Sequence, residues 1–360
     1  MKIAVDGFEI GKSFTGVGRY IYNLLREILN IDQTNEYTLF LKEEISSPFE
    51  AANLKTIVLD SNSSHTRWQN TKLIQALKNY SYDLFFSPNH SIPFFYRGKS
   101  LLTQHDASWI TQKKDYSLKE RLVRHFKSKY SFNKAQIIFT HSQFSKDELI
   151  KYYKINPNKI SVIHCGVELS FKRSSDKEIL EFKKKYQLGD SKVIGFLGSM
   201  FQRRHIKEIL LAFKHLEGEN FKLFLVGKDY SNGELKDIFN NKNIIYLERI
   251  SEARINTFYS TLDLFLYLSD YEGFGFPPME ALSCGTPPLL LNTSSLKEIF
   301  QDMAFFIDHP DPEIICETIL SALHNNQITK NLLEEFDKKA EYFTWSRAAK
   351  DYLKVFESFG

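Results

Sequence analysis

The sequence predicts an α/β protein with two domains, each built on a parallel β-sheet. Three observations predict this fold class. The chain has 360 residues, which is too many for one ordinary hydrophobic core and about right for two α/β domains. Short apolar runs alternate with segments of helical spacing along almost the whole chain. A charged stretch at 171–192 interrupts this alternation, which then starts again.

The first half contains seven apolar runs of strand length. They are expected to form strands at 2–5, 37–41, 55–59, 83–87, 100–105, 135–140 and 159–163. Helical spacing occurs between several of them, in 17–30, 69–80, 117–131 and 143–154. Strands that alternate with helices in this way form a parallel sheet with helices on both faces. We therefore predict a Rossmann-like domain over residues 1–170.

The second half repeats this organisation over residues 171–342. Its strands are expected at 193–198, 222–227, 243–247, 263–268, 286–291 and 304–308. The segment 171–190 is expected to be the crossing between the domains plus the first helix of the second one. The final segment, 343–359, reads as an amphipathic helix that carries Trp345. Two such domains in tandem should form a cleft between the carboxyl ends of their strands, where α/β sheets bind ligands.

The composition indicates a soluble globular protein. The chain is 42% hydrophobic and 25% charged, and no apolar run approaches the ~18 residues that span a bilayer. The first 16 residues lack the apolar core and cleavage site of a signal peptide, so a cytoplasmic location is expected. Cys165, Cys284 and Cys316 have no metal-ligand spacing, which fits a reducing compartment.

Basic residues are concentrated in the first half. Residues 1–170 contain 23 Lys and Arg against 16 Asp and Glu, whereas the remainder contains 24 against 28. Such an excess indicates an anionic partner, but no zinc-finger, RNA-recognition or helix-turn-helix signature supports nucleic acid. A membrane surface or a lipid pyrophosphate fits better, and a solvated helix face is the alternative. The cations predicted to face a membrane lie in 113–134, and they are Lys119, Arg121, Arg124, Lys127 and Lys129.

The segment 269–291 carries the strongest functional signal. It follows an apolar strand and combines Gly273 and Gly275 with two prolines and a short helix that ends at Gly285. A glycine turn leading into a helix N-terminus is an anion site, well suited to a diphosphate. Glu272 precedes the helix and Glu280 is expected in its first turn, so both carboxylates could accept hydrogen bonds from sugar hydroxyls.

These residues also resemble a known family. Glu272-Gly-Phe-Gly-Phe-Pro-Pro-Met-Glu280 is similar to the Glu-x7-Glu motif of retaining glycosyltransferases of family 4, which have the GT-B fold. The resemblance implies that Glu272 contacts the donor sugar and Glu280 the nucleoside ribose. It further implies that the turn residues Gly273, Phe274, Gly275 and Phe276 bind the donor.

Other segments extend the resemblance over nearly the whole chain. The stretch 198–213 resembles the family's phosphate loop, with Arg203 matching its Arg and Arg204 standing where the family commonly has Lys. Both cations are placed to neutralise a leaving diphosphate. Gly16 and Gly18, expected just before a helix, resemble the family's glycine loop near the donor phosphates.

Three further features complete the predicted site. His105, at the end of a strand, matches a family histidine that contacts the donor sugar, and the weaker candidate His141 also ends a strand. Glu298 lies in a stretch that resembles the family segment near the nucleotide. The ending 343–349 resembles the family's closing helix, which crosses back onto the first domain.

The resemblance implies transfer of a hexose from a nucleoside diphosphate sugar to a hydroxyl, with retention at the anomeric carbon. Mannose from GDP-mannose is favoured, with UDP-hexose or dTDP-rhamnose as alternatives, and the expected acceptor is a saccharide on a lipid carrier. No cofactor and no metal is expected, because cations and helix dipoles can hold the departing charge.

Two other functions remain open at this point. A nucleotide-sugar 2-epimerase shares the two-domain architecture, and donor alone would suffice for its reaction. A catalytically degenerate partner subunit would bind nucleotide or lipid and only support another transferase. A dinucleotide dehydrogenase is not expected, since no strand-linked G-x-G-x-x-G occurs.

Overall fold

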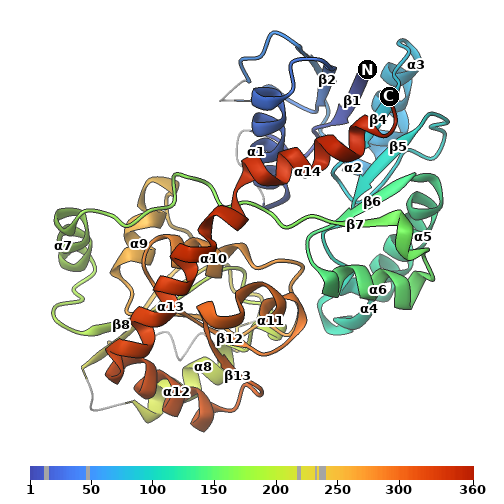
Figure 1. Cartoon of the computed structure of the whole chain (residues 1–360). Coiled ribbons are helices and arrows are strands. Elements are labelled where there is room, and N and C mark those ends of the chain that lie inside the picture. Colours follow the sequence, from blue (N-terminus) through green and yellow to red (C-terminus); the bar gives the residue numbers. More distant parts are fainter. Residues whose placement is uncertain (12–15, 46–48, 217–219, 232, 235–240) are drawn as a thin grey trace. The chain divides into compact units, whose positions relative to one another are not determined.

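The computed structural model describes the chain except residues 12–15, 46–48, 217–219, 232 and 235–240. The chain divides into two compact units (Figure 1). Unit 1 comprises Met1–Gly166 and Tyr342–Gly360, and unit 2 comprises Val167–Glu341. Each unit contains one fully parallel sheet with helices packed on it, which confirms the predicted fold class of two Rossmann-like domains.

Unit 1 is built on a seven-stranded sheet in the order β3-β2-β1-β4-β5-β6-β7. The order reverses between β1 and β4, and ligands bind beside such a switch point at the carboxyl ends of the strands. The strands are β1 (Lys2–Asp6), β2 (Glu36–Leu41), β3 (Leu54–Val58), β4 (Leu84–Ser87), β5 (Ser100–Thr103), β6 (Ile137–Thr140) and β7 (Ile160–Val162).

The helices of unit 1 cover both faces of this sheet. Helices α1 and α14 pack against each other, which places the last helix of the chain beside the first (Figure 1). The helices are α1 (Gly16–Ile31), α2 (His65–Trp68), α3 (Ile74–Lys78), α4 (Ser108–Thr111), α5 (Leu118–Lys134), α6 (Gln143–Tyr153) and α14 (Trp345–Glu357). A π-helical turn at Gln69–Leu73 joins α2 to α3, so the helix predicted at 69–80 begins earlier.

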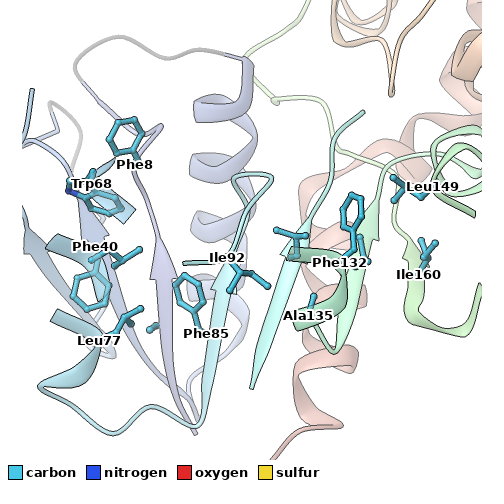
Figure 2. Packing of buried hydrophobic residues seen from close by; sticks show 14 of the residues in the cluster. Phe8, Phe40, Trp68, Leu77, Phe85, Ile92, Phe132, Ala135, Leu149 and Ile160 are labelled. Atoms are coloured by element: carbon cyan, nitrogen blue, oxygen red, sulfur yellow. The ribbon is translucent and has the colours of Figure 1, made fainter. Parts of the chain in front are cut away.

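Alternate residues of the strands point into two separate hydrophobic layers, one on each face of the sheet. Phe85 of β4 belongs to a buried cluster with Trp68, Leu77 and Phe132, contributed by the helical segments on one face (Figure 2). The next residue, Phe86, points to the other face and contacts Phe356 of α14, with ring centroids 5.4 Å apart. Burying such a side chain stabilises a fold by about 1.5–3 kcal/mol, so both layers hold the sheet in place.

Unit 2 is built on a six-stranded sheet in the order β10-β9-β8-β11-β12-β13. Its switch point lies between β8 and β11, which pair through Leu264 with Ile194 and Phe265 with Gly195. The strands are β8 (Lys192–Leu197), β9 (Phe221–Val226), β10 (Ile244–Leu247), β11 (Leu264–Tyr267), β12 (Pro288–Leu291) and β13 (Phe305–Ile307).

Two helices of unit 2 illustrate how side chains satisfy the free N–H groups at a helix start. Ser175 and Glu178 form a capping box at the start of α7, and Asp311 caps α12 just before Pro312. The helices are α7 (Asp176–Lys185), α8 (Ile206–His215), α9 (Ile255–Thr261), α10 (Phe276–Ser283), α11 (Ser294–Phe300), α12 (Pro312–His324) and α13 (Asn326–Lys339).

Each of the thirteen apolar runs predicted as strands overlaps a strand of the structure. The largest difference at a site residue is in the run 100–105, because β5 ends at Thr103 and leaves His105 in the loop that follows. None of the helices in the described part of the chain is long and apolar enough to cross a membrane.

Candidate functional site

The switch point of unit 2 brings the predicted cations and one predicted carboxylate together. The loop after β8 contains the 3-10 turn Gln202–Arg204, and the loop after β11 contains Glu272. Arg204 Nη2 lies 3.2 Å from Glu272 Oε1, and both side chains are largely buried. Two loops that follow neighbouring strands therefore meet in an ion pair, although 68 residues separate them in the sequence.

Arg204 is held from three directions. Its Nη1 donates to the carbonyl oxygen of Ser199 at 3.0 Å, and its guanidinium lies 4.9 Å from the ring centroid of Tyr267. Gly198 leaves room for this side chain, since a Cβ at that position would lie 2.4 Å from Arg204 Nη1. Gly198 also has φ +149°, a conformation that favours glycine. Arg204 is thus positioned by the chain before any ligand binds.

Glu272 is equally constrained. Its Oε1 accepts a second hydrogen bond, from Ser269 Oγ at 2.8 Å. Its backbone N–H donates to Ser294 Oγ and its carbonyl oxygen accepts from Ser295 Oγ, which ties the loop to the start of α11. A carboxylate already ion-paired and hydrogen-bonded is a fixed acceptor for a hydroxyl group.

Arg203 is directed elsewhere in the same loop. Its guanidinium lies 4.8 Å from the ring centroid of Phe201, and its carbonyl oxygen accepts a hydrogen bond from the N–H of Asp270. The structure therefore brings both predicted arginines to the end of β8, but it pairs Arg204 with Glu272.

His205 adds a third positive group at this point. Its Nε2 lies 2.8 Å from Asp270 Oδ1, and its Nδ1 lies 3.6 Å from Glu208 Oε2. Burial lowers the pKa of this imidazole, but the hydrogen bonds to Asp270 and Glu208 outweigh burial and raise its pKa to about 9. The segment Arg203–His205 therefore offers three cationic side chains at the start of α8, a suitable place for a phosphate group.

The predicted glycine turn and its helix are present, with one change in register. Gly275 has φ +106° and immediately precedes α10, in which Pro277 and Pro278 occupy the first turn. Glu280 lies in the second turn of α10, so its prediction in the first turn is wrong. The helix begins earlier than expected because Phe276 and both prolines are already helical.

Glu280 is buried rather than open to solvent. It is 8% exposed, and its Oε2 accepts a hydrogen bond from Tyr259 Oη at 2.8 Å. Burial, then the neighbouring carboxylate, raises the pKa of Tyr259, which keeps its hydroxyl protonated and donating. Glu298 lies on α11 and is partly exposed. The predicted turn residues Gly273 and Phe274 lie between Glu272 and α10, and Phe276 is the first residue of that helix.

In unit 1, His105 meets two further histidines that follow neighbouring strands. His90, His105 and His141 come after β4, β5 and β6, which are adjacent in the sheet. The ring centroid of His105 lies 4.7 Å from that of His90 and 4.9 Å from that of His141. From the sequence we ranked His141 below His105 and did not identify His90. All three positions nevertheless follow strands that end at the same edge of the sheet.

The hydrogen bonds of His105 leave neither ring nitrogen unused. Nε2 lies 2.9 Å from the carbonyl oxygen of Pro88, and Nδ1 lies 2.9 Å from His141 Nε2. Because a carbonyl oxygen only accepts, a neutral His105 carries its proton on Nε2, which leaves Nδ1 as an acceptor facing His141. His141 Nδ1 also lies 3.3 Å from the carbonyl oxygen of Ile163, so a neutral His141 donates to only one of these two acceptors. Burial lowers the pKa of His105 to about 4 and that of His141 well below its usual range, so both rings are neutral at pH 7.

Tyr20 of α1 packs against these rings and joins them to the last helix. Its ring meets that of His105 edge-on at 4.7 Å, and its hydroxyl lies 2.6 Å from Tyr352 Oη of α14. Gly16 and Gly18 lie in the first turn of α1, so the expectation that they precede the helix is wrong. Phe14 and Thr15 of the same motif lie outside the described residues.

The five cations predicted to face a membrane are not equivalent. Lys119, Arg124 and Lys129 are exposed. Arg121 and Lys127 are turned toward the protein, where they donate to Trp109 O and Thr66 Oγ1, so their predicted outward orientation is wrong. Burial also lowers the pKa of Lys127 to about 8. Cations lie on several sides of α5. Lys127, next to α2, and Arg121, next to α4, form hydrogen bonds with residues of those helices.

A metal site was not predicted, and the described residues contain no group of three or more His, Cys, Asp or Glu side chains arranged to hold a metal ion. A metal-free reaction stays a prediction.

Comparison with known proteins agrees with the geometry in both units. Residues 14–171 match the family described as Glycosyltransferase Family 4, and residues 178–342 match the family described as Glycosyl transferases group 1. O-antigen chain mannosyltransferase B of Escherichia coli is 25% identical to the chain, over 99% of the chain and 100% of that protein.

Solved structures share the fold at low sequence identity. Sucrose-phosphate synthase from Thermosynechococcus elongatus has a TM-score of 0.79 at 16% identity, covering 99% of this chain and 98% of that one. HepE from Anabaena, solved with UDP-glucose, has a TM-score of 0.78 at 15% identity, covering 99% of this chain and 100% of that one.

Proposed function

The chain is a glycosyltransferase of the GT-B fold, and on that premise we propose that it transfers a hexose from a nucleoside diphosphate sugar to a saccharide acceptor with retention of configuration. Mannose is the favoured sugar, with GDP-mannose as donor, because a relative of matching length is named as an O-antigen chain mannosyltransferase. The favoured acceptor is a lipid-linked saccharide of the kind used in polysaccharide biosynthesis.

The observation that carries the proposal is the Arg204–Glu272 pair at the switch point of unit 2. A nucleotide sugar presents a diphosphate next to a ring of hydroxyl groups, and this pair presents a cation next to a carboxylate. Arg203 and Arg204, together with the amides of Gly273–Phe276, are proposed to bind the diphosphate. Glu272 is proposed to accept from a sugar hydroxyl, and Glu280 and Glu298 to lie near the nucleoside.

The proposed reaction exchanges one bond at the anomeric carbon for another. The bond from this carbon to the diphosphate oxygen breaks, and the acceptor hydroxyl forms the new bond on the same face. The leaving phosphate oxygen takes the hydroxyl proton. Because the arginines already carry the charge that the departing diphosphate needs, the reaction as proposed uses no cofactor.

His105 is proposed to contact the donor sugar through its ring edge. In the ligand-free protein both of its nitrogens are engaged, so a hydrogen bond to the sugar requires the His105–Pro88 or the His105–His141 contact to open. Gly16 and Gly18, at the N-terminus of α1, are proposed to approach the donor phosphates.

We also propose peripheral contact with the anionic inner face of the plasma membrane, where a lipid-linked acceptor would lie. The exposed cations Lys119, Arg124 and Lys129 support this contact, since each cation near an anionic leaflet contributes about 1 kcal/mol.

The test is product analysis with a panel of nucleotide sugars, each with and without a saccharide acceptor. Transfer that requires acceptor, with the new linkage keeping the donor's anomeric configuration by NMR, is the expected result. Conversion of donor in the absence of acceptor would instead identify an epimerase. Binding without any turnover would identify a degenerate subunit.

A further inference from the structure

Polar residues follow the three central strands of the unit 1 sheet, at its switch point. Asp6 is the last residue of β1, Asn89 and His90 follow β4, and Gln104 follows β5. Because parallel strands end at the same edge of a sheet, these residues lie together where α/β sheets bind ligands. The reaction proposed above gives none of them a role.

Asn89 is fixed by the buried residue Asp6. Its Nδ2 donates to the carbonyl oxygen of Asp6 at 2.9 Å and to Asp6 Oδ1 at 3.0 Å. Asp6 Oδ2 accepts from Gln69 Nε2 at 3.0 Å and lies 2.8 Å from His65 Nε2. Because the carbonyl oxygen of Asp6 only accepts, the amide nitrogen of Asn89 must face Asp6. Its amide oxygen, Oδ1, is therefore left for another partner.

Gln104 is fixed in the same way and orients His90. Its Nε2 donates to the carbonyl oxygen of Asp106 at 2.6 Å and lies 2.9 Å from His90 Nδ1, so its second hydrogen goes to that ring. Burial lowers the pKa of His90 well below its usual range, and the neutral ring then carries its proton on Nε2. His90 also has φ +62°, and such a conformation in a residue other than glycine is commonest at functional sites.

Two buried oxygens of this cluster lack a hydrogen-bond donor. Asn89 is 3% exposed and Gln104 is 1% exposed, and among the described residues nothing donates to Asn89 Oδ1 or Gln104 Oε1. A buried acceptor without a donor costs free energy, so the pair indicates a ligand that supplies hydrogens, which an ionised diphosphate does not. With the His90 Nε2–H group beside them, the cluster matches hydroxyl groups, which both donate and accept.

We propose that Asn89, His90 and Gln104 bind hydroxyl groups of the acceptor saccharide and thereby select the acceptor. This inference rests on the proposed transfer and deepens it, since it names the residues that contact the second substrate. The ring centroid of His90 lies 4.7 Å from that of His105, the proposed contact of the donor sugar. A saccharide bound to the cluster therefore lies beside the donor sugar, as attack on the anomeric carbon requires.

The experiment measures saccharide binding by NMR titration, with and without GDP, and so needs no turnover. The probes are methyl α-mannoside, methyl α-glucoside and methyl α-galactoside, followed by the monodeoxy analogues of the one that binds best. The wild type is expected to bind at least one glycoside. It should lose about tenfold or more in affinity for one deoxy analogue, because the missing hydroxyl leaves a buried oxygen unpaired.

Two variants of the cluster should weaken binding of the parent glycoside by about tenfold. Gln104→Leu removes one acceptor oxygen at similar volume, and His90→Asn removes the imidazole but keeps a residue that tolerates positive φ. In at least one variant the further loss for the deoxy analogue should disappear, because that hydroxyl no longer has its partner. Melting curves confirm that the variants fold.

The matched control is Asn53→Leu. Asn53 Oδ1 is likewise buried without a partner among the described residues, but Asn53 precedes β3, where the strands begin. This variant should bind the glycoside like the wild type.

The inference is overturned if no glycoside binds the wild type, if Gln104→Leu and His90→Asn both bind normally, or if Asn53→Leu shows the same loss. A comparable rise in the donor Kd of both cluster variants would also overturn it, because the cluster would then hold the donor sugar. Glycoside binding without any transfer by the wild type would reject the proposed reaction and leave the saccharide contact standing.

Discussion

Two histidines that follow strands of the two sheets differ in charge at neutral pH, because one is positive and the other is neutral. His205, after β8 in unit 2, has its pKa raised to about 9 by Asp270 and Glu208, against the effect of burial. His105, after β5 in unit 1, has its pKa lowered to about 4 by burial, because its neighbours are a carbonyl group and another imidazole. The loops after β8 and β11 in unit 2 thus hold ionised groups, whereas the loops after β5 and β6 in unit 1 hold neutral imidazoles.

This difference fits a division of labour in the proposed reaction. A diphosphate needs fixed positive charge, which the segment Arg203–His205 supplies. Sugar hydroxyls need neutral or singly charged hydrogen-bonding groups, and the neutral histidines of unit 1 are groups of this kind. Substitutions at Arg204, Glu280, His205 and His141 test this contrast between the two units.

Removing the charge of Arg204 should have the largest effect. Arg204→Ala is expected to lower kcat by about 10²–10³-fold, because the departing diphosphate loses a preorganised partner. Steady-state rates with the active donor measure this change. Lys207→Ala, which removes an exposed cation in the first turn of α8, is the matched control and should keep the wild-type rate. Equal rates in both variants would remove Arg204 from the site.

Truncating Glu280 should weaken donor binding and also cost stability. A hydrogen bond to a charged group is worth ~1.5–3 kcal/mol, so Glu280→Ala should raise the donor Kd by roughly tenfold or more. It also leaves the buried Tyr259 hydroxyl without this acceptor, so the melting temperature should fall. Glu280→Gln keeps an acceptor for Tyr259 and should restore more of the stability than of the affinity. Titration of donor into the wild type, Glu280→Ala and Glu280→Gln measures these affinities. Unchanged affinity in Glu280→Ala would reject the ribose contact.

The raised pKa of His205 predicts a loss of stability in alkali. The charged imidazole stabilises the folded protein fully below pH 6.5, and this contribution disappears as pH rises through about 9. We expect the free energy of unfolding to fall by on the order of 2 kcal/mol across that range. Urea unfolding of His205→Gln should show a flatter profile, whereas His215→Gln, at an exposed position of α8, should follow the wild type. Parallel profiles for all three proteins would mean that His205 is not paired.

The neutral histidines of unit 1 predict the opposite slope. Because the folded protein holds His105 and His141 neutral, the unfolded state binds more protons between pH 6.5 and 4. The free energy of unfolding therefore decreases as the pH is lowered through that window. His141→Phe keeps the ring volume and removes one of these groups. The difference in unfolding free energy between pH 7 and pH 5.5 should shrink by about 1 kcal/mol in this variant. An undiminished difference would show that His141 is not held neutral.

The sequence predicted the strands because parallel strands buried on both faces appear as continuous apolar runs, as in 263–268 and 286–291. The family resemblance also predicted that Arg204 and Glu272 belong to one site, and the structure brings the two side chains together. It did not predict that Arg203 and Arg204 take different partners, because the aromatic rings of Phe201 and Tyr267 that receive them depend on side-chain packing.

The remaining differences between prediction and structure concern which face of a helix is buried, where a helix begins and how the strands are ordered. Spacing showed that Leu122, Val123 and Phe126 fall at helical positions, but spacing alone does not say whether that face meets the sheet or the solvent. In the fold, Ser128, Ser131 and Phe132 are the buried residues of α5 instead. Glu280 was placed one turn too early because the helix absorbs Phe276 and both prolines. The cluster of His90 with His105 and His141 depends on strand order, which a single sequence leaves open.

The most direct test of the proposed reaction is transfer from GDP-mannose to a mannose-containing oligosaccharide by the wild type and by Arg204→Ala, followed by NMR at the anomeric position. The account predicts a product that forms only when acceptor is present, keeps the donor's anomeric configuration, and appears about 10²–10³-fold more slowly with Arg204→Ala. A product of inverted configuration would contradict the proposed geometry. Conversion of the donor without acceptor, at the same rate in both proteins, would contradict the proposed function itself.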